Sequence, residues 1–489
     1  MLRENSQMKL SLSPYQGLYD RVVAKEHLLR KIKGNIDFSF VNPMLRKQYC
    51  EAFGRPAKEP EMMFKLLFLK KMYDLSDERL VSQAGTDMAY KYFLNLDPED
   101  EMIDSSLLTK FRKTRISEDI LEEMLRETIR QAIEKGIIKS NTIIVDSTHT
   151  EAAVRSMSTT QILRSLCKQL RRKIYQEMYD LSSKFPEKPS ETAELSKERA
   201  YAWELIEATA NDIETSNHEG LQGLHAHIKE LLESERIGEI RSKDDEDARR
   251  GHKTVNSTFF GYKNHIAMTE ERIITGIEVT SGEAPDGKQL PVLLEKSQSI
   301  GIVVKEVVGD MAYVSDDNLD ICTEKGVTLF AKTNSAVAAA AIASLDEGFC
   351  FNKDAGLLQC PAGELAMRIS KKTAENGNTY RNYFFSKVKC QKCPMCERCR
   401  IGKSKAKCYN ITQPSEKNRA RLEFEASEAF QERLEIRHRI EEKNGEMKVA
   451  HGLGRADSVG LAAMRLQTYF TAFVVNVKRI VKLMTPKPA

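Results

Sequence analysis

Two aspartates follow apolar runs that are typical of buried strands. Residues 143–145 lead into Asp146, and residues 307–309 lead into Asp310. Continuous β-branched runs favour strands that are covered on both faces. In open α/β sheets, groups that follow such strands lie at the edge where ligands bind. Carboxylates at that edge are the oxygen ligands that Mg²⁺ prefers, and two metal ions held there can cut and rejoin a phosphodiester backbone.

A third carboxylate, Glu441, lies in the charged and helix-favouring stretch 423–448. Arg437 precedes it by four residues and Lys448 follows it by seven, so a single helix would place all three on one face. Glu441 could then complete a metal-binding site while the two cations bind phosphates. The alternative is a surface helix that carries several ion pairs, which is usual for this charge pattern. Two further glutamates compete for the role without the same cation spacing: Glu442 and Glu446.

The elements around these carboxylates predict an α/β fold. Three meandering antiparallel strands are followed by two parallel strands that are joined by helices, which is the mixed five-stranded sheet of a ribonuclease-H-like core. In that sheet the strands that end in Asp146 and Asp310 are neighbours. The strands are expected at 142–146, 259–268, 273–280, 303–310 and 327–332, with helices at 290–299 and 316–325.

The N-terminal part has a helical pattern from residue 42 to residue 136. Pro60 marks a helix start, and apolar residues from Met62 to Met72 are expected on one face. Short helices that end in a basic one resemble a DNA-docking head. An ordinary helical bundle with a solvent-exposed basic face fits the same pattern. The candidate DNA contacts on the basic helix are Lys110, Arg112, Lys113 and Arg115.

A chain of 489 residues is long enough for two or three domains. The long polar stretch after the first strand predicts a helical insertion, and the cysteines predict a second insertion. The expected divisions are an N-terminal helical DNA-binding domain (1–140), a core (141–150 and 251–335), a helical insertion (151–250), a cysteine-rich insertion (336–420) and C-terminal helices that complete the core (421–489).

Composition says little about partners, because 75 lysines and arginines nearly balance 71 aspartates and glutamates. The charge is uneven, however. Nine cations lie between Arg381 and Lys407 beside a single acid, Glu397, which suits either phosphates or a solvated loop. The polar N-terminus does not resemble a signal peptide, and charged residues interrupt the apolar stretch 466–484. We therefore expect no membrane span and a cytoplasmic protein.

Motifs over most of the chain resemble those of DDE-type transposases of bacterial insertion sequences. The resemblance implies that Asp146, Asp310 and Glu441 are a catalytic triad that holds two Mg²⁺ or Mn²⁺ ions. Arg437, Glu441 and Lys448 match the family's Tyr-Arg-Glu-Lys signature, whose tyrosine falls at Leu434. An aromatic residue is usual where Asn444 stands. The motifs are VDSTHTEA (145–152), FFGYKNHIA (259–267), EVTSGEAPDGKQL (278–290), VVGDMAYVS (307–315) and RHRIEEKNGEMKVAHGLG (437–454).

The resemblance further implies cleavage and strand transfer of double-stranded DNA, from terminal inverted repeats into target DNA. It implies a homodimer on DNA that is associated with a bacterial nucleoid. A catalytically silent DNA-binding derivative and a simple ribonuclease-H-like nuclease remain alternatives. Lys263 is a further candidate phosphate contact. We expect His149 and His265 to be packed residues and Asp286 to be structural.

The cysteine block contains four cysteines at intervals of three residues. Paired knuckles of this kind are typical of tetrahedral zinc sites, and an iron–sulfur cluster can use similar spacing. Zinc is preferred, because DNA cleavage and joining need no redox chemistry. The block would either touch DNA or act as a structural clip. Two ligand sets are open, one with Cys360, Cys393, Cys396 and Cys399, the other using Cys390 and Cys408.

Overall fold

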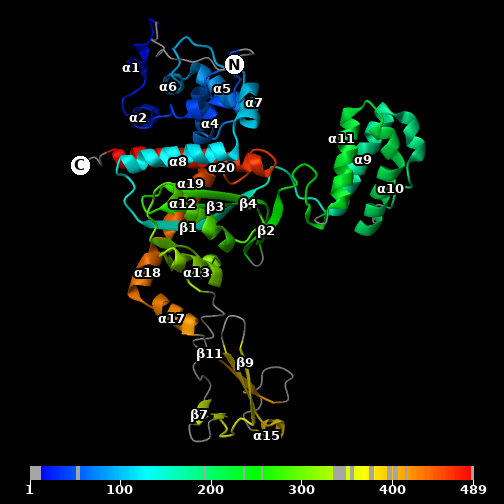
Figure 1. Cartoon of the computed structure of the whole chain (residues 1–489), viewed down its shortest axis with the longest axis vertical. Coiled ribbons are helices and arrows are strands. Elements are labelled where there is room, and N and C mark those ends of the chain that lie inside the picture. The colour runs from blue at the N-terminus through cyan, green and yellow to red at the C-terminus, as the bar shows by residue number, and fades with distance from the viewer. Residues whose placement is uncertain are drawn as a thin grey trace. The chain divides into compact units, whose positions relative to one another are not determined.

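The computed structural model shows a mixed α/β protein with a helical N-terminal region (Figure 1). The chain divides into two compact units, residues 1–304 with 438–489, and residues 305–437. The structure describes residues 13–50, 56–190, 194–234, 237–254, 257–333, 349–352, 357–373, 379–393, 399, 406–413 and 416–485.

The N-terminal helices pack around α4 (Pro60–Met72), which begins at the predicted proline. The expectation of a single apolar face on α4 is wrong. Almost every side chain of α4 is buried, including Lys65 and Lys71, because α3, α5, α7 and α20 all contact it. The other helices of this region are α1 (Leu18–Val22), α2 (Leu28–Asn35), α3 (Val41–Arg46), α5 (Asp77–Thr86), α6 (Met88–Phe93), α7 (Ser106–Arg115) and α8 (Glu118–Glu134).

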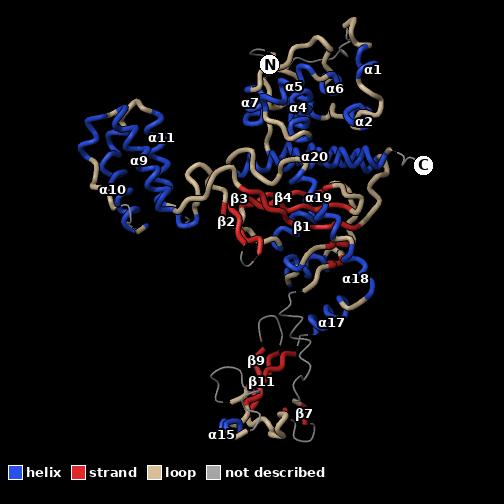
Figure 2. The backbone as a smooth tube through the Cα atoms, turned by 180° about the vertical axis from the view of Figure 1, so that it is seen from behind, coloured by secondary structure: helices blue, strands red, loops and turns tan. Residues whose placement is uncertain are grey.

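The last helix, α20 (Leu461–Met484), forms the centre of the first unit. It lies with α8 between the N-terminal helices and the sheet (Figures 1 and 2). Phe470 and Phe473 place their rings 5.1 and 5.3 Å from that of Phe64 on α4. Asn476 bonds the amide and the carbonyl of Ile274 at 2.8 Å each, which satisfies polar backbone groups inside this core. None of the described helices is long and apolar enough to cross a membrane.

The sheet of the first unit is built around β3, which pairs antiparallel with β1 on one side and with β2 and β4 on the other. The hairpin of β3 and β4 turns at residues 270–271, as predicted, and the predicted helix α12 (Leu290–Ser299) packs against β4. No local pattern predicted β2, which is polar and pairs with the first part of β3. The strands are β1 (Thr142–Glu151), β2 (Arg249–Thr254), β3 (Ser257–Thr269) and β4 (Ile274–Ser281).

Strand β1 extends five residues beyond its predicted end, so Asp146 lies within the strand and not at its end. The pairing with β3 continues to Glu151, opposite Gly261. A segment that follows α19 also supports this end of β1. The Glu151 amide donates to the carbonyl of Gly454 at 3.0 Å, and the Ala456 amide donates to the carbonyl of Glu151 at 2.8 Å. Pairing on both edges holds polar residues in a strand that apolar content alone does not predict.

The helical insertion forms three helices with a hydrophobic core of their own. Helix α9 begins with a capping box between Ser158 and Gln161. Its buried face, with Leu166 and Leu170, packs on residues such as Leu205 and Ile228 of the other two helices. The insertion therefore contains enough apolar surface to fold as a bundle. Its helices are α9 (Thr159–Glu177), α10 (Leu195–Glu214) and α11 (Glu219–Glu233).

The second unit contains the parallel pair β5 and β6, whose strands are shorter than predicted. The rings of Phe330, Phe424 and Phe430 pack together beside β6, with centroids 5.2 to 5.8 Å apart. Arg421 donates to the carbonyls of Leu329 and Ala331, which ties α17 to the end of β6. The elements are β5 (Glu306–Val308), η4 (Met311–Tyr313), α13 (Asp316–Glu324), β6 (Thr328–Phe330), α17 (Glu416–Glu425) and α18 (Glu428–Glu435).

A small lobe with five buried core residues lies between β6 and α17 in the sequence. It contains a two-stranded antiparallel sheet, β7–β8, and a three-stranded antiparallel sheet in the order β11–β10–β9. Its described elements are β7 (Cys350–Asn352), β8 (Leu357–Gln359), β9 (Arg368–Thr373), β10 (Thr379–Phe384), α15 (Lys387–Gln391) and β11 (Cys408–Gln413).

Candidate active site

Helix α19 (His438–Val449) packs against β1, the strand that contains Asp146. Glu441 and Lys448 lie on this helix, seven residues apart. The prediction that Arg437 shares the same helical face is wrong, because α18 ends at Glu435 and a turn separates it from α19. Arg437 lies in that turn, with its amide bonded to the carbonyl of Leu434 at 3.1 Å.

Asn444 of α19 makes a direct contact with Asp146. Its Nδ2 donates to Oδ2 of the half-buried Asp146 at 2.9 Å. A carboxylate oxygen only accepts hydrogen bonds, so the amide NH₂ of Asn444 must face Asp146. The Oδ1 atom of Asn444 is buried and has no hydrogen-bond partner among the described residues. Asn444 is 8% exposed, so an unsatisfied oxygen lies inside the protein next to the predicted catalytic aspartate.

Lys448 and Lys253 place positive charge near Glu151, at the C-terminal end of β1. Half-buried Lys448 lies in the field of Lys253, Asp146 and Glu151. Burial and then Lys253 lower the pKa of Lys448, while the two acids oppose the shift. Burial, followed by the charges of Lys448 and Lys253, lowers the pKa of His149 to about 4, so His149 is neutral at pH 7. The two lysines therefore supply charge that suits phosphate groups.

A buried chain of hydrogen bonds fixes the segment after α19 to the sheet. Thr150 of β1 donates its hydroxyl to the carbonyl of Leu453 at 2.7 Å. Asn264 of β3 donates to the Thr150 hydroxyl at 2.8 Å and accepts from the Thr468 hydroxyl of α20 at 2.7 Å. Thr150, Asn264 and Thr468 are completely buried. Satisfied buried networks of this kind restrict the elements that they join to one arrangement.

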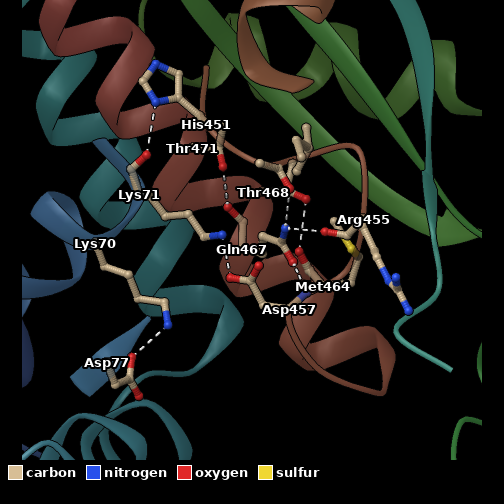
Figure 3. Close-up of polar contacts among 12 residues, drawn as sticks. Lys70, Lys71, Asp77, His451, Arg455, Asp457, Met464, Gln467, Thr468 and Thr471 are labelled. Carbon is tan, nitrogen blue, oxygen red and sulfur yellow. Dashed lines mark hydrogen bonds and ion pairs between the residues drawn. The ribbon is translucent and has the colours of Figure 1, made fainter. Parts of the chain in front are cut away.

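The same segment is also held against α4 and α20 (Figure 3). Gln467 of α20 accepts from the amide of Asp457 at 2.8 Å and donates to the carbonyl of Arg455 at 2.9 Å. Lys71 of α4 forms an ion pair with Asp457, and its carbonyl bonds Nδ1 of buried His451 at 2.9 Å. Helix α19 is therefore followed by a loop that the protein core holds on several sides.

Both glutamates that compete with Glu441 have structural partners. Glu442 Oε2 lies 2.7 Å from Arg272. Glu446 Oε2 lies 2.8 Å from the buried ammonium of Lys443, and its Oε1 lies 3.1 Å from Lys478. Burial alone would raise the pKa of Glu446, but the two lysines outweigh burial and lower it. These contacts explain both residues as parts of the fold.

Asp310 belongs to the second unit and lies two residues after the end of β5, whereas it was predicted to be the last residue of the strand. It is half-buried, and its Oδ1 accepts from the amide of Ala312 at 2.9 Å at the start of η4. Asp146 and Glu441 belong to the first unit. Within the described ranges, no three side chains among His, Cys, Asp and Glu are grouped so that they could hold a metal ion.

Lys263 is engaged by the protein itself. Its Nζ lies 2.9 Å from both Asp286 Oδ1 and the carbonyl of Ala284. These contacts support the structural role predicted for Asp286. His265 is fully buried and bonds the Thr280 hydroxyl through Nε2 at 2.9 Å, which agrees with a packed histidine.

The basic helix α7 presents its four cations in two ways. Arg112 forms two hydrogen bonds with Asp77, at 2.6 and 2.9 Å. Arg115 donates to the carbonyl of Gln48 and lies over the ring of Tyr49, 4.6 Å from its centroid. The remaining two, Lys110 and Lys113, are exposed. The arginines hold the helices together, and the lysines face solvent.

The cysteine lobe brings four thiols to one pocket. Cys360 after β8, Cys390 on α15, and Cys393 and Cys399 after it line this pocket. Three of them, Cys360, Cys390 and Cys399, pack against the core of the lobe. Cys396 lies outside the described residues. Cys408 is exposed on β11, where its thiol bonds Asn410 Oδ1 at 3.3 Å.

Two family models match the chain. "Transposase domain (DUF772)" matches residues 17–114, which include most of α7. "Transposase DDE domain" matches residues 359–481, which include the cysteine lobe from Cys360 onward, α19 and most of α20. The two matches support a DDE-type transposase of insertion sequences, which agrees with the motifs of the sequence. No curated protein and no solved structure matches the transposase. Its matched domains imply DNA as the partner.

Sequence reasoning missed two contributors to the site of this transposase. Asn444 follows Glu441 by three residues, so helical spacing alone would have placed it on the same face. Lys253 had no usable signal, because the strand that carries it, β2, was not expected.

Proposed function

We propose that this transposase cuts DNA at the terminal inverted repeats of its element and joins the ends to target DNA. Asp146, Asp310 and Glu441 would be the metal-holding carboxylates. The observation that carries the proposal is the packing of α19 on β1, with Asn444 bonded to Asp146 and Glu441 on the same helix. The family match over residues 359–481 supports the role of α19.

The chemistry of the predicted ligands suits divalent ions such as Mg²⁺. The predicted ligands are carboxylates, which hard cations prefer. Asn444, which bonds Asp146 through Nδ2, has a buried Oδ1 without a partner among the described residues. When bound, two such ions would activate a water or a 3′-hydroxyl and stabilise the departing 3′-oxygen.

The protein groups would supply position and charge. Asn444 holds the carboxylate of Asp146 through its Nδ2. Lys448 and Lys253 would neutralise backbone phosphates at the end of β1. The buried bonds of Thr150, Asn264 and Thr468 hold the loop after α19 against β1 and β3. This scheme needs no covalent link between protein and DNA, so no serine or tyrosine nucleophile is required.

Recognition of the terminal repeats would come from the N-terminal helices. Lys110 and Lys113 are exposed on α7, within the residues matched by the first transposase domain. Exposed lysines suit phosphate contacts that position a protein on DNA. Since two ends of the element must be joined, we propose a homodimer on DNA.

The test supplies purified protein and divalent ions with either intact or pre-cut terminal repeats, together with a target plasmid. Joined product from pre-cut ends supports the transposase, and nicks without joining support the nuclease. Binding without any cleavage supports the silent derivative. Asp146→Asn and Asp310→Asn should each abolish cleavage and leave DNA binding nearly intact. Unchanged cleavage in either variant would contradict the role of that residue.

We also propose that the cysteine lobe holds one structural zinc ion. Cys360, Cys390, Cys393 and Cys399 line the same pocket, and Cys360, Cys390 and Cys399 pack against the hydrophobic core of the lobe. Thiolates at such positions are the usual ligands of structural zinc. Cys408 is excluded from this set because it lies outside the pocket and bonds Asn410.

Metal analysis of the purified protein tests this set. We expect about one zinc per chain, lost from Cys393→Ser and retained by the matched control Cys408→Ser. Iron with a visible absorbance band would support a cluster instead. Full zinc content in Cys393→Ser would overturn the proposed set.

A further inference from the structure

We propose that Asn444 is a positioning residue of the active site. Its Nδ2 holds the Asp146 carboxylate, and its Oδ1 accepts a hydrogen bond from a water that hydrates a divalent ion. The inference rests on the proposed function. The residue lies on α19, three positions after Glu441.

The first observation is the polarity of the contact. Asn444 Nδ2 donates to Asp146 Oδ2 at 2.9 Å. This bond removes rotational freedom from the carboxylate, which must be held in one orientation to serve a metal ion. The same bond fixes the amide, so its Oδ1 cannot turn toward Asp146.

The second observation is the cost of the remaining oxygen. Asn444 is 8% exposed, and its Oδ1 has no partner among the described residues. A buried carbonyl oxygen without a hydrogen-bond partner destabilises the folded state. Purely structural asparagines in this unit do not show this pattern. Asn264 and Asn476, both completely buried, use the oxygen as well as the nitrogen of their amides.

The third observation is the chemistry of the neighbours. Asn444 is on α19 between Glu441 and Lys448, three residues after one and four before the other, so all three share a helical face. Mg²⁺ dehydrates reluctantly and keeps several of its waters in protein sites. A buried acceptor on this face is therefore suited to a hydrogen bond from water that hydrates the ion.

Asn444→Ala should weaken binding of the metal more than it weakens the fold. We expect the affinity for Mn²⁺, measured by calorimetry on the complex of protein and terminal-repeat DNA, to fall about 10–100-fold. The increase in Tm that Mn²⁺ produces in wild type should shrink accordingly. Cleavage should be recovered at high metal concentration, because the carboxylate ligands remain.

Three variants make the outcome decisive. Glu442→Gln, on the same helix and paired with Arg272, should keep wild-type metal affinity. Asn444→Asp, nearly equal in volume, should lower Tm without metal through repulsion from Asp146 and gain more Tm than wild type when Mn²⁺ is added. Asp146→Asn should show no metal response.

The results separate the two proposals. If wild type neither cleaves nor responds to metal, the proposed function fails. If wild type does both and Asn444→Ala binds Mn²⁺ with unchanged affinity, only the role of Asn444 fails. An equal loss of Tm in Asn444→Ala with and without metal would also overturn it, because that result describes a packing residue.

Discussion

Thr150 on β1 donates its hydroxyl to the carbonyl of Leu453, 303 residues later in the sequence, at 2.7 Å. The same hydroxyl accepts from Asn264, so one buried side chain joins β1, β3 and the loop that follows α19. The position of α19 beside Asp146 depends on this junction.

Thr150→Val should therefore destabilise the first unit. The change keeps the shape of the side chain but leaves Asn264 and the Leu453 carbonyl without this partner. We expect a loss of about 1–3 kcal/mol in the free energy of unfolding, measured by urea denaturation. Thr114→Val, an exposed position on α7, should change it by less than about 0.5 kcal/mol. A neutral Thr150→Val would show that the junction does not hold α19.

Glu441→Gln and Glu442→Gln form a matched pair on α19. A metal ligand contributes several kcal/mol to the stabilisation of the transition state, so Glu441→Gln should slow cleavage of terminal-repeat DNA by roughly a thousandfold, each ~1.36 kcal/mol being tenfold. Glu442→Gln removes only a partly exposed ion pair with Arg272 and should cleave at close to the wild-type rate. Similar rates for the two variants would contradict the assignment of Glu441.

The lysines and the arginines of α7 should have different roles: the lysines in DNA affinity and Arg112 in stability. Replacing Lys110 and Lys113 by alanine should reduce the slope of log affinity against log salt by about 2 and leave Tm unchanged. Replacing Arg112 should lower Tm, because it removes the two bonds to Asp77. Wild-type affinity should fall roughly a thousandfold between ~50 and ~200 mM salt, as measured by fluorescence anisotropy. A salt-independent affinity would contradict the phosphate contacts.

Asp77 should make stability depend on acid pH. Burial alone would raise the pKa of Asp77, but the bonds and charges of Arg112 and Lys70 outweigh burial and lower the pKa from 3.8 to about 2. A lowered carboxyl pKa stabilises the fold above 3.8, and this contribution disappears as the pH falls through about 2.

The measurement is the difference in the free energy of unfolding between wild type and Asp77→Asn at several pH values. It should be constant near neutral pH and shrink as the pH falls from 3.8 toward 2. In Lys70→Ala the loss should begin at higher pH. A difference that does not vary with pH would mean that the ion pairs do not stabilise the folded state.

The sequence predicted the elements that local patterns determine. The helix at Pro60, the hairpin at residues 270–271 and α12 agree with the structure, because proline, turn residues and apolar periodicity act over a few positions. That a strand leads to Asp310 was also predicted from its own apolar run, although β5 ends two residues before it.

The remaining features depend on partners that are distant in the sequence. Strand β1 continues to Glu151 because Gly454 and Ala456 bond its end. Helix α4 is buried on most sides because α20 covers it. The turn at Arg437 interrupts a stretch that is rich in helix-favouring residues. The contact of Asn444 with Asp146 depends on how α19 packs on the sheet, which no local pattern records.

Helix α20 also determines when the first unit can form during synthesis. The N-terminal helices and the sheet both pack on it, so their shared core stays open on the ribosome until residue 484 has been added. Asp146 bonds Asn444, which is translated 298 residues later. Nascent chains that stall before this helix should therefore lack the folded core of the first unit.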